Sequence, residues 1–377
     1  MNVQLTDEQK LLQDSVAKFC AAEIPLTKVR DLVDNAMGLT DELWQKVAEQ
    51  GWLGVMVPEE FGGLALGIQE LGAVCEEFGR ALIPGAYLST VLAAHAIALG
   101  GTDTAKTRWL EKVVGGEAKG ALALIEETGE FAQAAIKCKA VKNGAGYLLN
   151  GTKYLVADAE AADFFIVAAI TGEGAKAGLS YFAVDKNAGG VTVKPNKVSD
   201  LTSRSGQVYL NNTPVGDDCL VGTEGGAQAI YDPLMKVANV CIAAGSVAGA
   251  EYIHRLTVAY AKERTQFGKL IGSFQAVKHP LVDMFALIES ARSAYHYAAW
   301  AVEANSPDVD SAVAVSRLTA TEAYRQTTLV CLQMHGGIAF TWEYDLHLFL
   351  KRAKHNQYLY GTPKDYEEII CKKALGI

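Results

Sequence analysis

Residues 261–279 read AKERTQFGKLIGSFQAVKH and interrupt a helical pattern. The two ends of this stretch have the composition of helices, but its middle does not, because Gly268 and Gly272 frame a short apolar insert. Arg264 stands just before the break and Gln275 just after it. An arginine there is most often a helix-end residue that balances the helix dipole, but its fork of donors also suits a phosphate. The residues alone leave both interpretations open.

The pattern around this break divides the chain into three parts. Residues 1–118 carry apolar side chains at helical spacing, as in DELWQKVAEQGWLGVM (41–56). Residues 119–222 change to short β-prone runs separated by Gly, Asn and Asp turns. Residues 223–377 return to long helical runs, and small residues from 243 to 249 predict close helix packing. This order predicts an α+β fold with an N-terminal helical domain, a middle β-domain and a C-terminal helical domain.

Composition restricts the function further. The chain has 377 residues and a net charge of −9, which argues against a nucleic-acid partner. No stretch reads as a membrane span, and the start lacks a secretory signal and instead resembles a helix capped by Thr6. The seven cysteines are scattered, without CxxC or metal-like spacing, so they favour reduced thiols. We therefore expect a cytoplasmic protein without a membrane partner or a metal.

A second glycine-rich break lies in LQMHGGIAF (332–340). Gly336 and Gly337 most simply end a helix, but bare glycine backbone also lets a ligand approach closely. His335 is expected to be a packed or capping side chain, because no second ligand stands at metal-like spacing. None of the GxGxxG, GxxxxGK[ST], GxSxG or HExxH motifs occurs. The residues alone thus predict a ligand site of unspecified kind.

Taken together, the motifs resemble one family. YAKERTQFGKLIGSFQ (260–275) and QMHGGIAFTWEYDLHLFLKRA (333–353) resemble the C-terminal half of the acyl-CoA dehydrogenases. QGWLGVMVPEEFGGLALGIQELGAVCEEFGRAL (50–82) resembles their N-terminal helical domain. The resemblance covers nearly the whole chain and implies the family's fold, in which the C-terminal domain is a four-helix domain.

The resemblance also implies an activity. Family members bind FAD, usually as dimers of dimers, and oxidise an acyl-CoA thioester to the trans-2-enoyl-CoA. A carboxylate removes the α-proton while a hydride leaves the β-carbon for the flavin, and an electron-transfer protein accepts the electrons. By position, two groups of residues would contact the adenosine and pyrophosphate of an FAD lying mainly in the neighbouring subunit, with Thr362 as a further contact. They are Arg264, Gln266, Phe267 and Gln275, and Gln333, Gly336 and Gly337.

The positions expected beside the flavin ring depart from the family pattern. A T-E-P-like turn usually touches the ring, and here Ile125, Glu126 and Glu127 replace it. A later strand usually carries a Trp and a Thr or Ser beside the ring, and here Leu155 and Ala157 stand at those positions. Leucine and alanine supply neither a stacking indole nor a hydroxyl hydrogen bond.

The positions expected for the catalytic carboxylate depart as well. Tyr360 precedes Gly361 and Thr362, where a carboxylate commonly stands, and a phenol with a pKa of about 10 is a poor base. The alternative position, on the first helix of the C-terminal domain, holds Ala238 beside Asn239, where an Arg is common. The catalytic base therefore stays unassigned by the sequence.

Three hypotheses follow. The first is one subunit of an α2β2 acyl-CoA dehydrogenase, in which this chain supplies the adenosine side of the FAD site and a partner supplies the ring pocket and the base. The second is a self-sufficient flavoenzyme with a displaced base, or with a base-free reaction such as acyl-CoA desulfination. The third is a non-catalytic scaffold or acyl-CoA-binding module, because a fold does not imply a function.

Overall fold

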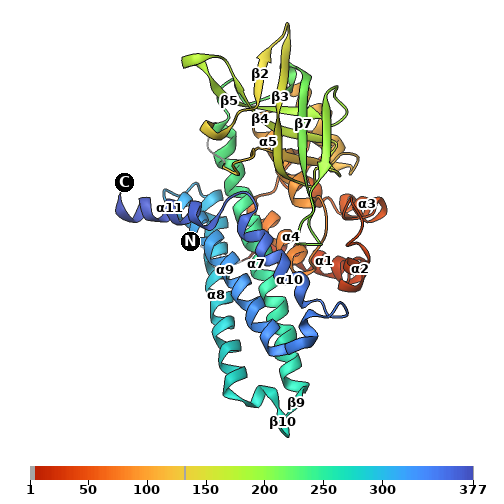
Figure 1. The fold of residues 1–377 in the computed structure, drawn as a ribbon, viewed down its shortest axis with the longest axis vertical. Coiled ribbons are helices and arrows are strands. Elements are labelled where there is room, and N and C mark those ends of the chain that lie inside the picture. Colours follow the sequence, from red (N-terminus) through yellow and green to blue (C-terminus); the bar gives the residue numbers. More distant parts are fainter. Residues whose placement is uncertain (1–4, 131–132, 377) are drawn as a thin grey trace.

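The computed structural model describes residues 5–130 and 133–376 and has the three parts that the sequence predicts (Figure 1). The first helix begins where the sequence predicts a cap. The Thr6 side chain accepts a hydrogen bond from the Gln9 backbone, and the Gln9 side chain accepts one from the Thr6 backbone. The N-terminal helices are α1 (Asp7–Glu23), α2 (Leu26–Asp31), α3 (Asp41–Glu49), α4 (Ile68–Arg80), α5 (Tyr87–Gly100) and α6 (Asp103–Val114).

The middle part is a mostly antiparallel sheet with strand order β6-β7-β3-β2-β4-β5-β8, and β1 joins it by pairing with β4 in parallel. The strands are β1 (Gly120–Ala123), β2 (Lys139–Lys142), β3 (Gly146–Ala157), β4 (Phe164–Thr171), β5 (Gly178–Asp185), β6 (Val191–Pro195), β7 (Ser205–Gly216) and β8 (Leu220–Val221). The β3–β7 register shifts between Lys153 and Val156. This irregularity leaves Leu155 60% exposed, with a φ of 50°.

The C-terminal part is a helical bundle in which α7, α8 and α9 run side by side away from the sheet (Figure 1). Its helices are α7 (Gln228–Glu263), α8 (Gln275–Glu303), α9 (Val309–His335), α10 (Leu346–Tyr358) and α11 (Pro363–Leu375). By length and composition alone, α7 is long and apolar enough to cross a bilayer. However, 83% of its most apolar window is buried, so α7 packs as the central helix of the bundle.

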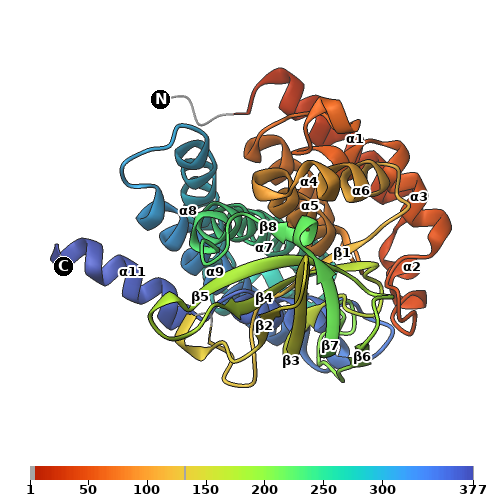
Figure 2. The same cartoon turned by 90° about the horizontal axis from the view of Figure 1, so that it is seen from above.

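One continuous core joins the N-terminal helices to the bundle, because α4 and α5 pack directly on α7 (Figure 2). The predicted small-residue stripe makes this possible. A Cβ added to Gly79 of α4 would lie 2.4 Å from the Cα of Gly245 of α7. A Cβ added to Gly249 would lie 2.7 Å from the Tyr324 ring of α9. The predicted close helix packing is thus confirmed at both contacts.

Candidate cofactor site

The break at residues 264–274 is a tight hairpin at the end of the bundle that lies farthest from the sheet (Figure 1). α7 ends at Glu263, and the carbonyl of the next residue, Arg264, accepts a 2.8 Å hydrogen bond from the Ile271 N–H. Between them, β9 (Thr265–Gln266) pairs antiparallel with β10 (Lys269–Leu270). Phe267 and Gly268 form the turn with φ values of 53° and 74°, the left-handed geometry of a two-residue hairpin loop. The sequence predicted a loop here, and the structure makes it a defined hairpin.

The predicted ligand-binding side chains of this hairpin point into solvent. Arg264, Gln266 and Gln275 are exposed, and their side chains form no hydrogen bond or ion pair with any residue in the described ranges. Phe267 is 92% exposed. A bulky residue held at positive φ with its ring in water is costly in a monomer. This combination is typical of a surface that another molecule covers.

The second predicted group lies at the same end of the molecule. α9 ends at His335, and its imidazole stacks on Tyr260 in the last turn of α7, with ring centroids 4.2 Å apart. His335 is 5% exposed and its Nδ1 lies 2.9 Å from the Cys331 carbonyl oxygen, so it packs as expected. Beyond it, a Cβ added to Gly336 or Gly337 would meet nothing within 4 Å. The glycine backbone is therefore open for a ligand to lie against it.

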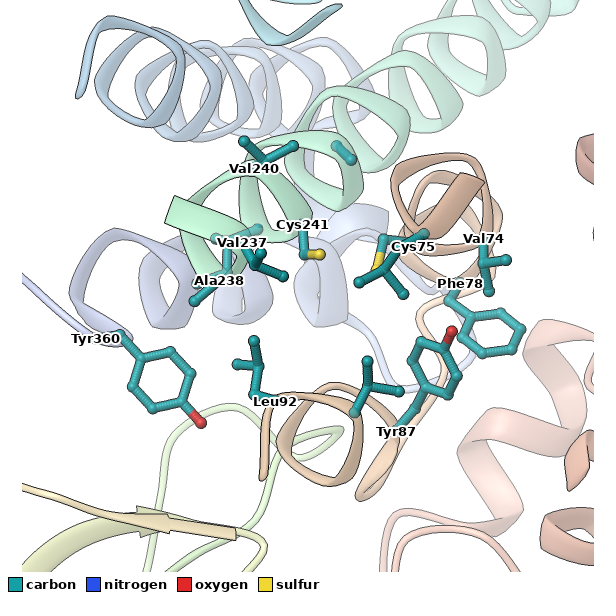
Figure 3. Packing of buried hydrophobic residues seen from close by; sticks show 14 of the residues in the cluster. Val74, Cys75, Phe78, Tyr87, Leu92, Val237, Ala238, Val240, Cys241 and Tyr360 are labelled. Carbon is teal, nitrogen blue, oxygen red and sulfur yellow. The ribbon is translucent and has the colours of Figure 1, made fainter. Parts of the chain in front are cut away.

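Of the positions expected beside the flavin ring, Ala157 lies near Tyr360, one of the two positions expected for the base, whereas Leu155 is exposed. Tyr360 is 9% exposed and belongs to the same buried cluster as Ala238 and Leu92 (Figure 3). Tyr360 and Ala157 line a common cavity of only about 70 Å³. Pockets that hold small-molecule ligands usually measure about 300–1,000 Å³. This space is therefore much smaller than a typical ligand pocket.

A buried polar network fixes Tyr360 in this position. Arg317, which is 1% exposed, donates from Nη2 to the Leu359 carbonyl over 2.7 Å and from Nε to Asn239 Oδ1 over 3.0 Å. The Tyr366 hydroxyl lies 2.7 Å from Asn239 Oδ1 and 3.1 Å from the Tyr360 carbonyl oxygen. Burial, and then the nearby Asp158 carboxylate, raise the pKa of the Tyr360 phenol well above its ordinary value. Tyr360 thus stays protonated and is unsuited to act as a base.

Sequence reasoning missed a buried carboxylate beside Tyr360. Asp158 directly follows the last residue of β3, lines the same 70 Å³ cavity and is 7% exposed. Ser89 of α5 donates to its Oδ2 over 2.6 Å. Burial raises the pKa of Asp158 to about 6, against the opposing effect of that hydrogen bond. The available signal was an aspartate directly after the β-prone run KYLVA (153–157).

We expect Asp158→Asn to stabilise the fold at neutral pH. An unfolded aspartate titrates near 3.8, but the folded group titrates near 6, so stability falls as pH rises from about 4 to 6 and stays lowered above it. The asparagine abolishes this penalty, keeps an acceptor for Ser89 and tolerates the local φ of 56°. Urea unfolding should show a gain of roughly 2–3 kcal/mol at pH 7 that vanishes below about pH 4.

The matched control for this prediction is Asp200→Asn. Burial tends to raise the pKa of Asp200 too, but Arg352, whose Nε lies 2.7 Å from Oδ2, brings about a net lowering. That carboxylate therefore contributes stability at pH 7, and its removal should destabilise. A loss of stability at pH 7 in both variants would contradict the proposed state of Asp158.

Of the three residues that replace the T-E-P-like turn, Glu126 turns inward. Its Oε1 lies 2.8 Å from the Lys153 ammonium and accepts the Cys138 N–H, and its Oε2 accepts the Lys137 N–H. Lys153 is fully buried, so this pair holds β3 against the segment before β2.

Thr362 also has a local role, since its hydroxyl donates a hydrogen bond to Asp365 at the start of α11. Its predicted cofactor contact stays a prediction.

Comparison with known proteins identifies the chain. Family models for the N-terminal, middle and C-terminal domains of acyl-CoA dehydrogenases match residues 6–117, 121–213 and 225–375. The acyl-CoA dehydrogenase IpdE2 of Mycolicibacterium smegmatis is 30% identical over 96% of this chain and 97% of its own length. The chain belongs to the acyl-CoA dehydrogenase family. The predicted family, fold class and FAD-dependent oxidoreductase activity are thereby confirmed.

Solved structures of acyl-CoA dehydrogenases match along the whole chain. Butyryl-CoA dehydrogenase from Megasphaera elsdenii superposes with a TM-score of 0.92 at 25% identity, with 100% of both chains covered. A chain of the ChsE4–ChsE5 complex from Mycobacterium tuberculosis superposes with a TM-score of 0.90 at 29% identity, again with 100% of both covered.

The family's cofactor fits one of the two regions. At the hairpin, Arg264 offers a guanidinium fork to a diphosphate, Gln266 and Gln275 offer amides, and open glycine backbone lies beside them. FAD supplies the hydride acceptor of the reaction when it is bound. The region around Tyr360 does not fit the flavin ring, because its cavity is small and Ala157 has no hydroxyl.

Proposed function

We propose that this chain is one subunit of a mixed acyl-CoA dehydrogenase that oxidises an acyl-CoA thioester to the enoyl-CoA. It supplies the adenosine side of the FAD site, and an unlike partner of the same family supplies the ring pocket and the catalytic carboxylate. The observation that carries the proposal is the contrast between the two regions. The hairpin residues are exposed and unpaired within the described chain, whereas the cavity lined by Ala157 and Tyr360 is only about 70 Å³.

The length of α7 supports a second chain. Arg264 directly follows α7, which carries Ala238, and a rise of 1.5 Å per residue separates the two residues by about 39 Å. That separation exceeds the span of an extended dinucleotide. An FAD whose diphosphate contacts Arg264 therefore has its ring in another chain, and the expected assembly is a dimer of such pairs.

Two relatives support the proposed partners. The ChsE4–ChsE5 complex, by its name, joins two differently named chains, and one of its chains matches this one along its full length. Another matching structure, with a TM-score of 0.92, is described as the electron transferring flavoprotein of Acidaminococcus fermentans. For this chain we therefore propose a non-identical partner and an electron-transfer protein as the electron acceptor. We place this assembly in the cytoplasm.

The flavin content of the purified chain tests the proposal. Purified alone, the chain should show almost no flavin absorbance. Co-expression with an acyl-CoA dehydrogenase-like chain encoded beside it should restore flavin and acyl-CoA oxidation. About one FAD per chain in the protein purified alone would contradict the proposal. Absence of FAD with every such partner would instead favour a non-catalytic scaffold.

The second candidate is a self-sufficient flavoenzyme, and Asp158 is the observation that favours it. Asp158 is a carboxylate beside Tyr360, and its raised pKa of about 6 is close to that of an effective base. This candidate requires the cavity at Tyr360 to widen enough for a flavin and a thioester. It predicts bound FAD in the chain alone and loss of turnover in Asp158→Asn at unchanged flavin content.

A further inference from the structure

Two buried cysteines face each other where the N-terminal helices meet the bundle. Cys75 of α4 and Cys241 of α7 point their sulfur atoms toward one another (Figure 3). Cys75 lies close enough to Cys241 to raise the pKa of the Cys241 thiol, and the two residues are 7% and 2% exposed. Both are free thiols in the structure. The proposed flavin chemistry uses neither of them.

The helices that carry these thiols approach unusually closely. One turn beyond Cys75 and Cys241, Gly79 and Gly245 bring the backbones together, so a Cβ on Gly79 would lie 2.4 Å from the Gly245 Cα. A Cβ on Gly245 would itself lie 3.3 Å from the Cys75 carbonyl oxygen. A disulfide needs Cα atoms about 4.4–6.8 Å apart and Cβ atoms that point toward each other. Close helix approach with facing sulfur atoms favours this geometry.

We propose that Cys75 and Cys241 close to a disulfide when the folded protein meets a thiol oxidant, and that this bond ties α4 to α7. The two thiols lose two protons and two electrons as the S–S bond forms. A diazene oxidant such as diamide takes both protons and both electrons at its N=N bond, and a dithiol reductant reverses the step. Because the bond joins two of the three parts of the fold, it makes their packing sensitive to oxidation. This inference is independent of the proposed function.

The environment of Cys75 and Cys241 sets the expected rate of disulfide formation. Burial, and then the neighbouring Cys75 thiol, raise the pKa of the Cys241 thiol well above its ordinary value. The thiolate is the attacking species, so a scarce thiolate makes closure slow. We therefore expect closure over minutes to hours, which also keeps the pair reduced during brief exposure.

The experiment uses the full chain with its more accessible thiols removed, Cys219→Ser and Cys371→Ser, which leaves five cysteines. After treatment with diamide under native conditions, the protein is denatured and alkylated with N-ethylmaleimide. We expect three alkylated thiols in place of five, a crosslinked peptide pair containing residues 75 and 241, and full recovery after dithiothreitol. The oxidised form should melt several degrees above the reduced form, because the crosslink restricts the unfolded chain.

The controls separate this pair from the other thiols. Cys75→Ala and Cys241→Ala should each abolish the loss of two thiols, whereas Cys331→Ala, at a buried cysteine of α9, should leave it intact. Peptide mapping of the parent protein identifies the crosslinked pair even if an alanine variant folds poorly. Five alkylated thiols after prolonged oxidation of the folded chain, or a crosslink between another pair, would overturn the proposal.

Discussion

Replacing Arg264 and Gln275 together by alanine should weaken FAD binding to the co-expressed assembly by roughly 100-fold. A charge-assisted hydrogen bond contributes about 1.5–3 kcal/mol and a neutral one about 0.5–1.5 kcal/mol, so losing one of each costs about 3 kcal/mol. Both side chains are exposed and make no contact in the described chain that folding requires. The melting temperature of the isolated chain should therefore stay unchanged. Titration of the flavin-free assembly with FAD measures the effect.

Lys269→Ala is the matched control for that double variant. Lys269 is an exposed cation of the same hairpin, but it lies outside the group that the family motif assigns to the cofactor. Its removal should change the dissociation constant of FAD by less than about threefold, as expected for a solvent-screened charge. Equal losses in both variants would indicate a general effect of charge, and no loss in the double variant would remove the hairpin from the site.

Lys153→Met should destabilise the chain by about 3–5 kcal/mol. The substitution leaves the Glu126 carboxylate, itself 8% exposed, without its cationic partner in the interior. The expected loss of stability agrees with the direction in which the pKa of Glu126 is shifted. Burial alone would raise it, but Lys153 and two backbone N–H groups bring about a net lowering. Urea unfolding monitored by circular dichroism measures the change.

Lys142→Met provides the comparison for the buried pair. Lys142 also forms an ion pair, with Asp217, but both side chains are more than half exposed. Such pairs contribute about 0–1 kcal/mol, so this variant should unfold almost like the parent. If Lys153→Met lowers the free energy of unfolding by less than about 1 kcal/mol, the buried Glu126 carboxylate does not depend on Lys153.

The sequence predicted the parts of the fold that local pattern determines. Helical spacing, β-prone runs and turn residues were enough for the order of the three parts, and the small residues near Gly245 were enough for close helix packing. The break after Arg264 was also predictable, because two glycines interrupt a helical pattern. Its form as a hairpin was not, since Phe267 at positive φ is an unusual choice for such a turn.

For the positions expected beside the flavin ring and for the catalytic base, the sequence could predict only which chemical groups are missing. The sequence showed that Tyr360, Ala238, Leu155 and Ala157 lack the expected groups, but it gave no sign that Tyr360 is buried beside a small cavity. That outcome depends on Arg317, which reaches the 359–360 turn from a different helix. Asp158 was missed for the same reason, because its burial arises from α5 and α10 packing over the end of β3. Contacts between distant segments leave no local pattern.

Native mass spectrometry of the co-expressed assembly, which counts FAD molecules against subunits, tests whether this chain holds one end of an FAD whose ring lies in an unlike chain. We expect one FAD for each unlike pair, and none in assemblies of this chain alone. One FAD for every chain, or FAD retained by this chain without a partner, would contradict it.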